Sequence, residues 1–310
     1  MSDAPEIKTV EIPARTYPAR LRFKLSADAA ALAIGLPVRS TSPVEFWISM
    51  LQMLPPLNVK LHYIVQKGAD VPGGKLGAAA RNEILQSAIN SGTPYVMFFD
   101  DDVLFPDMAA YRLWVAMQRR PGAGAVTGIY ATKADPCEPL IYLDEGSGAF
   151  WDWALGDLIE IHSAGAGIQI VDMEAVKRIP PPWFNDVVHD GEKDADGLVR
   201  RFTWGHDRFF HIRLREEAKA PIYVDTGILC AHWDTEHQRA YLLPPDSPCF
   251  QRPPVGESFV PFLEPNGAVN WKRYLADPKQ GWAPFRGYLE WLAEQQGTGG
   301  AHDLQKMVAA

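Results

Sequence analysis

The sequence predicts an α/β fold with a mostly parallel sheet flanked by helices, followed by an irregular C-terminal extension. Between Ala31 and Phe99, apolar runs of strand length alternate with longer stretches whose apolar residues recur at helical spacing. This alternation is typical of a parallel sheet with crossover helices. Beyond Leu243 the chain is rich in proline and tryptophan and the alternation stops, which indicates the extension.

The elements of the first part follow from their apolar patterns. Strands are expected at Ala31–Leu36, Leu61–Val65, Tyr95–Phe99 and Ala125–Tyr130. Helices are expected around Phe46, Trp47, Met50, Leu51 and Leu54 (ending at Pro55-Pro56), around Ala80, Ile84, Leu85, Ala88 and Ile89, and over Met108–Gln118. The run Tyr95–Phe99 is wholly apolar, as expected for a strand buried on both faces. In such sheets, ligands bind beyond the carboxyl ends of the strands.

The second part is less regular. Strands are expected at Ile168–Val171 and Ile222–Val224, and a helix at Asp207–Glu217. Loops are expected at Pro37–Ser42, Gly68–Gly77, Pro180–Pro182 and Asp186–Gly197. A last helix is expected near Tyr288–Gln295, before a frayed tail that starts at Gly297.

Composition excludes several classes of protein. The net charge of -8 disfavours a large nucleic-acid interface, because such interfaces neutralise phosphates with basic residues. No apolar run approaches the roughly 20 residues that a membrane-spanning helix needs, and no signal peptide is visible. The three cysteines show neither a disulfide framework nor metal-site spacing. We therefore expect a soluble, cytoplasmic protein.

Three adjacent carboxylates follow the apolar run: Asp100, Asp101 and Asp102. Carboxylates this close repel each other, and a divalent cation with a preference for oxygen ligands relieves the repulsion. Alternation along an extended chain places Asp100 and Asp102 on one side and Asp101 on the other. The triplet therefore predicts a metal site, with a solvated turn that caps the next helix as the alternative.

Further motifs stand around this triplet, in a fixed order. They are Arg81-Asn82-Glu83 before it, and Gly165-Ala166-Gly167, Pro182-Trp183-Phe184, Trp204-Gly205-His206-Asp207, Ile222–Asp225 and His232 after it. Together with the Asp-x-Asp pattern, they resemble the GT-A-fold, metal-dependent nucleotide-sugar glycosyltransferases over about residues 31–235. The resemblance implies a Rossmann-like GT-A-type sheet. The sequence departs from the family at His206, where a glutamate is usual.

The resemblance also implies roles for individual residues. Asp100, Asp102 and His232 would bind Mn²⁺ or Mg²⁺. The donor, a UDP- or GDP-sugar, would contact Pro37, Val38, Arg39, Arg81, Asp100 and Asp101. The acceptor and the transferred sugar would lie against Gly165, Ala166, Gly167, Trp204 and His206. Asp207 would be the general base that takes the acceptor's proton, which implies inversion at the anomeric carbon; in an enzyme that retains configuration, Asp207 would have another role.

The same resemblance divides the chain. A nucleotide-sugar half (31–130) and an acceptor half (131–243) form the catalytic domain, between an N-terminal arm (1–30) and the extension (244–310).

Three acceptor classes fit: a polysaccharide, a protein, or a hydroxymethylated base in viral DNA. The negative charge disfavours DNA, whereas a group of basic residues on the acceptor side favours it: Lys193, Arg200, Arg201, Arg208, Arg213 and Arg215.

Each role has a purely structural alternative. Arg81 would pair with a carboxylate, Asp207 would cap its helix and His232 would be a buried structural histidine. The tryptophans Trp151, Trp153, Trp183 and Trp204 would pack in the core instead of lining a sugar cleft.

Two other functions compete with glycosyl transfer. One is a nucleotidyltransferase acting on a sugar phosphate, with Asp70–Gly77 as a weak phosphate loop. The other is a catalytically inactive sugar-binding module on the same fold. The His206-Asp207 and His232 segments favour the glycosyltransferase over the first, and the complete set of aspartates argues against the second.

Overall fold

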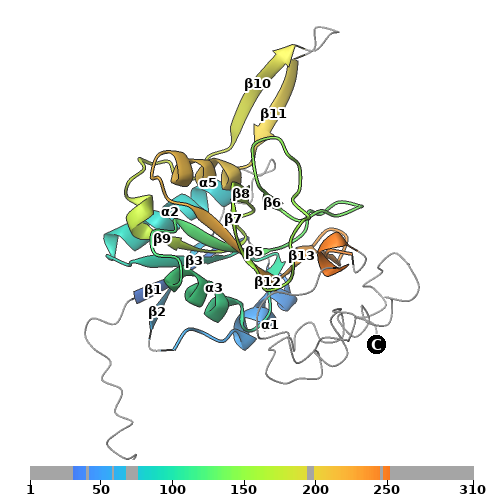
Figure 1. Cartoon of the computed structure of the whole chain (residues 1–310). Helices are drawn as coiled ribbons and strands as arrows, with labels where there is room; N and C mark the ends of the chain where they lie inside the picture. Colours follow the sequence, from blue (N-terminus) through green and yellow to red (C-terminus); the bar gives the residue numbers. More distant parts are fainter. Residues whose placement is uncertain are drawn as a thin grey trace, which may run out of the picture.

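The computed structural model describes residues 31–39, 42–57, 59–67, 76–193, 199–244 and 247–251. The expected N-terminal arm, the helix near Tyr288–Gln295 and the tail lie outside these residues. A seven-stranded sheet forms the centre of the described part, with strand order β2-β1-β3-β9-β5-β12-β7 (Figure 1). The α/β class predicted from the sequence is confirmed.

The strands of this sheet are β1 (Ala31–Val38), β2 (Lys60–Lys67), β3 (Tyr95–Phe99), β5 (Ala125–Ile129), β7 (Leu158–Ile161), β9 (Ile168–Asp172) and β12 (Ile222–Leu229). β1 runs parallel to β2 and β3, and β12 runs parallel to β5. β9 lies antiparallel between β3 and β5, and β7 is antiparallel to β12. Five of the seven strands therefore point the same way, which matches the mostly parallel sheet expected.

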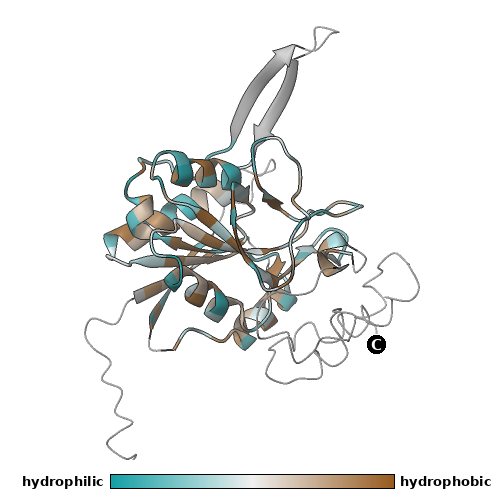
Figure 2. Cartoon of the chain, viewed as in Figure 1, coloured by the Kyte–Doolittle hydropathy of each residue, from teal (hydrophilic) through white to brown (hydrophobic). Residues whose placement is uncertain are grey.

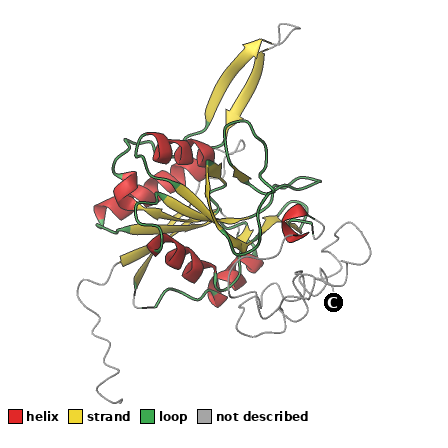
Figure 3. Ribbon diagram, viewed as in Figure 1, coloured by secondary structure: helices red, strands yellow, loops and turns green. Residues whose placement is uncertain are grey.

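Helices cover both faces of the sheet (Figure 3). One face carries α2 (Leu76–Asn90), the short α4 (Met173–Val176) and α5 (His206–Glu216). The opposite face carries α1 (Val44–Gln52) and α3 (Ala109–Gln118). Hydrophilic and hydrophobic residues alternate around α2 and α5, as expected for helices with one face on the core (Figure 2).

Smaller elements lie around the sheet. A three-stranded sheet joins β14 (Arg239–Tyr241), β13 (Ala231–Asp234) and β4 (Val103–Leu104), and β6 (Ile141–Tyr142) pairs with β8 (Ser163–Ala164). The antiparallel ribbon of β10 (Val187–Lys193) and β11 (Val199–Trp204) projects from the body in Figure 1. A 3-10 turn at Pro248–Gln251 ends the described chain.

The core is built from the apolar runs that predicted the strands. Val96, Met97, Phe98 and Phe99 of β3 are fully buried, and Trp153 and Trp183 are buried as core residues rather than exposed in a cleft. The alternative of core packing is thus confirmed for these two tryptophans. The cysteines Cys137, Cys230 and Cys249 are free thiols, as the spacing predicted. Among the described helices, none has the length and apolar character needed to cross a membrane.

The helix expected around Phe46, Trp47, Met50, Leu51 and Leu54 is confirmed as α1; its Phe46 is buried, whereas Trp47 and Leu51 are exposed, at 42% and 85%. Two expected loops are partly wrong. The expected loop at Asp186–Gly197 is mostly strand β10, because Val187–Lys193 finds a partner in β11.

The expected loop at Pro37–Ser42 begins later than predicted. β1 continues through Pro37 and Val38, which lie opposite Gln66 and Lys67 of β2. Because β1 runs to Val38, only Arg39 and Ser42 of this segment are described beyond the strand.

Candidate functional site

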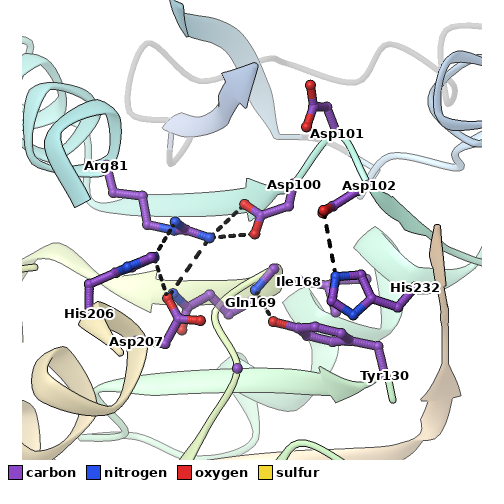
Figure 4. Close-up of polar contacts among 12 residues, drawn as sticks. Arg81, Asp100, Asp101, Asp102, Tyr130, Ile168, Gln169, His206, Asp207 and His232 are labelled. Atoms are coloured by element: carbon purple, nitrogen blue, oxygen red, sulfur yellow. Dashed lines mark hydrogen bonds and ion pairs between the residues drawn. The ribbon is translucent and has the colours of Figure 1, made fainter. Parts of the chain in front are cut away.

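The candidate site lies where several chain segments meet at the carboxyl edge of the sheet. Asp100 follows β3, Arg39 follows β1 and Tyr130 follows β5. β9 runs in the opposite direction, so the segment before it reaches the same edge and brings Gly165–Gly167 there. Asp207 arrives from the first turn of α5. Figure 4 shows Asp100, Tyr130 and Asp207 near the buried Arg81.

Arg81 of α2 connects the two halves of the site. Its side chain is buried, and Nη2 donates to both carboxylate oxygens of Asp100, at 2.7 Å for Oδ1. Nη1 lies 2.8 Å from Nε2 of His206, and Nη2 lies 4.0 Å from Oδ1 of Asp207 (Figure 4). The predicted contact of Arg81 with a nucleotide stays a prediction, because its guanidinium is occupied by protein groups in this structure.

The two carboxylates around Arg81 have different electrostatic environments. Burial raises the pKa of Asp100 to about 6, although Arg81 acts in the opposite direction. Burial would also raise the pKa of Asp207, but Arg81, His206 and the backbone N–H of Ala166 hold it well below the usual range. Oδ1 of Asp207 is buried and, although it forms no well-aligned hydrogen bond with the described residues, it lies 3.0 Å from Nε2 of His206. Asp207 is therefore held as an ionised carboxylate between Arg81 and His206.

His206 is held from the other side by Asp186. Oδ1 of Asp186 accepts from the backbone N–H of His206 at 3.0 Å and lies 3.2 Å from the ring Nδ1. Nε2 of the same ring lies 3.0 Å from Oδ1 of Asp207. Helix α5 begins at His206, and its N-cap residue Gly205 has no side chain to accept from the first turn. Asp186 takes over this capping function, so the alternative of Asp207 as the N-cap is wrong.

Asp102 belongs to a second, more exposed group. Its Oδ2 lies 2.7 Å from Nζ of Lys133, 3.3 Å from Nη2 of Arg39 and 3.6 Å from Nε2 of His232. Burial would raise the pKa of Asp102, but His232, Lys133 and Arg39 hold it below the usual range. The pairing of β4 with β13, and a backbone bond from Trp233 to Asp102 at 2.7 Å, bring His232 to this place.

The geometry of His232 fits a metal ligand. Its Nδ1–H donates to the carbonyl of Ala131 at 2.8 Å, so Nε2 is the ring nitrogen that faces Asp102 (Figure 4). A second ring nitrogen fixed by a carbonyl is typical of metal-binding histidines. Asp100 does not join this pair, because Arg81 occupies both its oxygens. Among the described residues, no three His, Cys, Asp or Glu side chains form a group that could hold a metal ion.

Asp101 points away from both groups, as strand alternation predicted (Figure 4). It is buried and accepts from the backbone N–H and Nε of Arg39, at 2.7 and 3.0 Å, and from the hydroxyl of Ser42 at 2.8 Å. Asp101 thereby fixes the turn after β1 and aims the Arg39 guanidinium at Asp102. The predicted donor contacts of Pro37, Val38 and Asp101 stay predictions.

The glycine segment lies under Tyr130. The Tyr130 hydroxyl accepts from the N–H of Gly167 at 3.0 Å, and a Cβ at Gly165 would lie 2.2 Å from that hydroxyl oxygen. The carbonyl of Gly167 accepts from the N–H of Asp100 at 2.8 Å. Tyr130 can therefore lie this close to the backbone only because residues 165 and 167 are glycines. This packing explains the two glycines without a contact to a sugar. Burial and the nearby carboxylates raise the pKa of Tyr130 well above its ordinary value.

Two other motif residues have structural roles. Oδ1 of Asn82 accepts from the backbone N–H groups of Trp183 and Phe184, at 2.9 and 3.0 Å, and so joins the Arg-Asn and Pro-Trp-Phe motifs. Trp204 ends β11 two residues before His206, and nothing of its side chain is described.

Sequence reasoning missed Lys133, Tyr130 and Asp186. A lone lysine in a loop and a tyrosine after a strand carry no pattern of their own, and Asp186 was assigned to a loop. The expected strand Ala125–Tyr130 was a usable signal for Tyr130, since the strand's last residue lies at the ligand-binding edge.

Comparisons with known proteins give little beyond this geometry. No family model and no curated protein matches the sequence. Among solved structures, the chain is similar to A197 from STIV, with 15% identity, a TM-score of 0.44, and coverage of 68% of this chain and 93% of that one. It is also similar to the catalytic domain of Drosophila β1,4-galactosyltransferase 7 in complex with xylobiose, with 18% identity, a TM-score of 0.39, and coverage of 68% and 74%. Identities and TM-scores this low support no inference about function.

Proposed function

We propose that this protein is a glycosyltransferase that moves a sugar from a nucleoside-diphosphate sugar to an acceptor hydroxyl, with inversion at the anomeric carbon. One observation carries the proposal. Asp100 and Asp207, which are 107 positions apart in the sequence, meet across the buried Arg81 at the ligand-binding edge of the sheet. At this edge the surrounding groups keep Asp207 ionised, which is the form that a general base needs.

The diphosphate of the donor binds beside Asp102, Arg39 and Lys133. Arg39 and Lys133 are two cations at one edge of the sheet, and their positive charges suit a diphosphate. Asp101 holds Arg39 in place, so little side-chain freedom is lost when a donor binds.

A metal ion is proposed at Asp102 and His232, with Asp100 as a third ligand only after it leaves Arg81. When bound, Mn²⁺ or Mg²⁺ supplies positive charge to the departing diphosphate. Lys133 already neutralises Asp102, so a metal ion must compete with this lysine for the carboxylate.

The acceptor end lies at Asp207. Its carboxylate accepts the proton of the acceptor hydroxyl, and the hydroxyl oxygen then bonds to the anomeric carbon from the face opposite the departing diphosphate. General-base assistance of this kind contributes roughly 10²- to 10⁴-fold. Arg81 keeps Asp207 ionised at neutral pH, so the carboxylate is in the form that a base requires.

Polysaccharide, protein and hydroxymethylated DNA base remain the proposed acceptor classes. Arg213 is engaged by Glu217 and by the carbonyl of Pro182, which reduces the free basic surface that a DNA acceptor would use. The proposal therefore ranks a carbohydrate or protein hydroxyl before DNA.

The test is a screen of UDP- and GDP-sugars against the full chain, with and without Mn²⁺. A donor should raise the melting temperature, since a ligand that binds only the native state stabilises it. The same donor should be slowly hydrolysed at the anomeric carbon. A sugar-binding module would bind a sugar without hydrolysing any donor, and a nucleotidyltransferase would instead release pyrophosphate from a nucleoside triphosphate. Either result would refute the proposal.

A further inference from the structure

His206 occupies the position where the sequence departs from the family pattern, and its ring stands between a cation and an anion. Nε2 lies 2.8 Å from Nη1 of Arg81 and 3.0 Å from Oδ1 of Asp207. A single ring nitrogen cannot serve both partners at once. It either accepts from the guanidinium or donates to the carboxylate.

The hydrogen bonds around the ring assign its state before the reaction. Nη1–H of Arg81 donates to the Nε2 lone pair, and Nδ1–H donates to Asp186 at 3.2 Å. Oδ1 of Asp207 then accepts no hydrogen bond from the described residues, as the structure has it. The neutral ring therefore leaves Asp207 free to act as a base.

We propose that His206, oriented by Asp186, receives the acceptor's proton from Asp207 during glycosyl transfer. This inference rests on the proposed function. The acceptor O–H bond breaks, its proton moves to Asp207 and then to Nε2 of His206, and the acceptor oxygen bonds to the anomeric carbon. The electron pair of the broken anomeric C–O bond leaves with the diphosphate. His206 finally returns the proton to solvent, to which its side chain is 19% exposed.

The charges around His206 favour this direction. In the described part of the chain, the charged groups that face the ring are Arg81 from α2, Asp207 from its own helix and Asp186 from the segment before β10; Asp100 lies behind Arg81. Burial would lower the pKa of His206, but Asp207 and Asp186 raise it above its ordinary value of about 6.5. A proton on Asp207, whose pKa is held low, is therefore more stable on His206.

Asp186 is the positioning residue in this arrangement. Its carboxylate is anchored by the backbone N–H of His206, so it can hold Nδ1–H in place and stabilise the imidazolium without moving. A carboxylate that orients the base through its second nitrogen has the same effect in other proton-transfer sites.

The test compares two conservative variants with the parent. His206→Gln keeps an acceptor for Arg81 and a donor for Asp186, but it cannot hold a proton. We expect kcat for transfer to fall roughly 10- to 100-fold, and to fall by a larger factor than slow donor hydrolysis. Asp186→Asn keeps the acceptor oxygen but removes the charge, so the pKa of His206 should fall.

The pH profile separates this role from a structural one. The parent should lose kcat/KM as the pH falls through the raised pKa of His206, because the ring must start neutral. This acid limb should vanish in His206→Gln and move to lower pH in Asp186→Asn. Asp100 titrates nearby, so a limb that persists in folded His206→Gln belongs to Asp100 and overturns the proposal.

An NMR titration of the His206 ring in the unliganded protein gives a readout that needs no transfer activity. A pKa above about 6.5 that falls in Asp186→Asn supports the proposal. A pKa that does not respond to Asp186→Asn overturns it. Absence of hydrolysis with every nucleotide sugar would instead overturn the proposed function, and the NMR result distinguishes the two failures.

Discussion

Replacing Arg81 with methionine tests whether this arginine neutralises the candidate site. The variant keeps most of the buried aliphatic volume and removes the charge between Asp100 and Asp207. Breaking a buried ion pair by removing one partner costs about 3–5 kcal/mol, and we expect this loss at pH 7. Asp100 contributes the smaller part, because burial raises its pKa to about 6 even with Arg81 in place.

Asp207 contributes the larger part, because Arg81 is a main reason for its low pKa. In the parent, a carboxylate with a lowered pKa stabilises the fold above its unfolded pKa of about 3.9, and this contribution fades in acid. In Arg81→Met, both carboxylates bind protons more tightly in the native state than in the unfolded state. The free energy of unfolding of Arg81→Met should therefore fall furthest below that of the parent at neutral pH, and the difference should shrink towards pH 4.

Urea unfolding of parent and variant at about pH 4.5 and pH 7.5 measures this difference. The double variant Arg81→Met/Asp207→Asn is the matched control, because it removes one uncompensated charge and should recover part of the stability at pH 7.5. A loss below about 1 kcal/mol, or a loss that is equal at both pH values, would refute the electrostatic reasoning.

Three further predictions concern the groups around this centre. Asp102→Asn should stay folded but bind Mn²⁺ more weakly in an isothermal titration with nucleoside diphosphate. His232→Ala should weaken Mn²⁺ binding in the same titration. Unchanged affinity in either variant would remove that residue from the metal site. Lys133→Met should bind Mn²⁺ about 3- to 10-fold more tightly, because the competing cation on Asp102 is gone, and weaker binding would contradict the competition. Tyr130→Phe should lose about 1–3 kcal/mol in urea unfolding, because the buried N–H of Gly167 loses its acceptor, and a neutral result would show that this bond contributes nothing.

The sequence predicted the strand that carries the site and the direction of its side chains. Tyr95–Phe99 is wholly apolar because both faces of β3 are covered, and the next residues inherit its alternation, which sends Asp101 away from Asp100 and Asp102. α5 was predicted within one residue at each end. These features are local, so a short window of sequence contains them.

The partners of these residues were harder to predict. Nothing local places Asp186 against His206, since the contact exists only because β10 and β11 form a ribbon whose two ends meet at the site. Lys133 reaches Asp102 across 31 positions, from a loop with no pattern. Likewise, apolar residues at helical spacing predicted α1, but the spacing does not show how many of them are covered: Leu51 is 85% exposed.

Asp207→Asn is the most direct test of whether Asp207 takes the acceptor's proton. The asparagine preserves size but cannot accept a proton at neutral pH, and the helix N-terminus is capped by Asp186, so folding should survive. Once a donor and an acceptor are known, transfer and acceptor-free donor hydrolysis are measured side by side in parent and variant. We predict that kcat for transfer falls roughly 10²- to 10⁴-fold, while donor affinity and hydrolysis fall much less. Transfer at a near-parental rate would contradict the claim, and loss of donor binding would place Asp207 in the donor site instead.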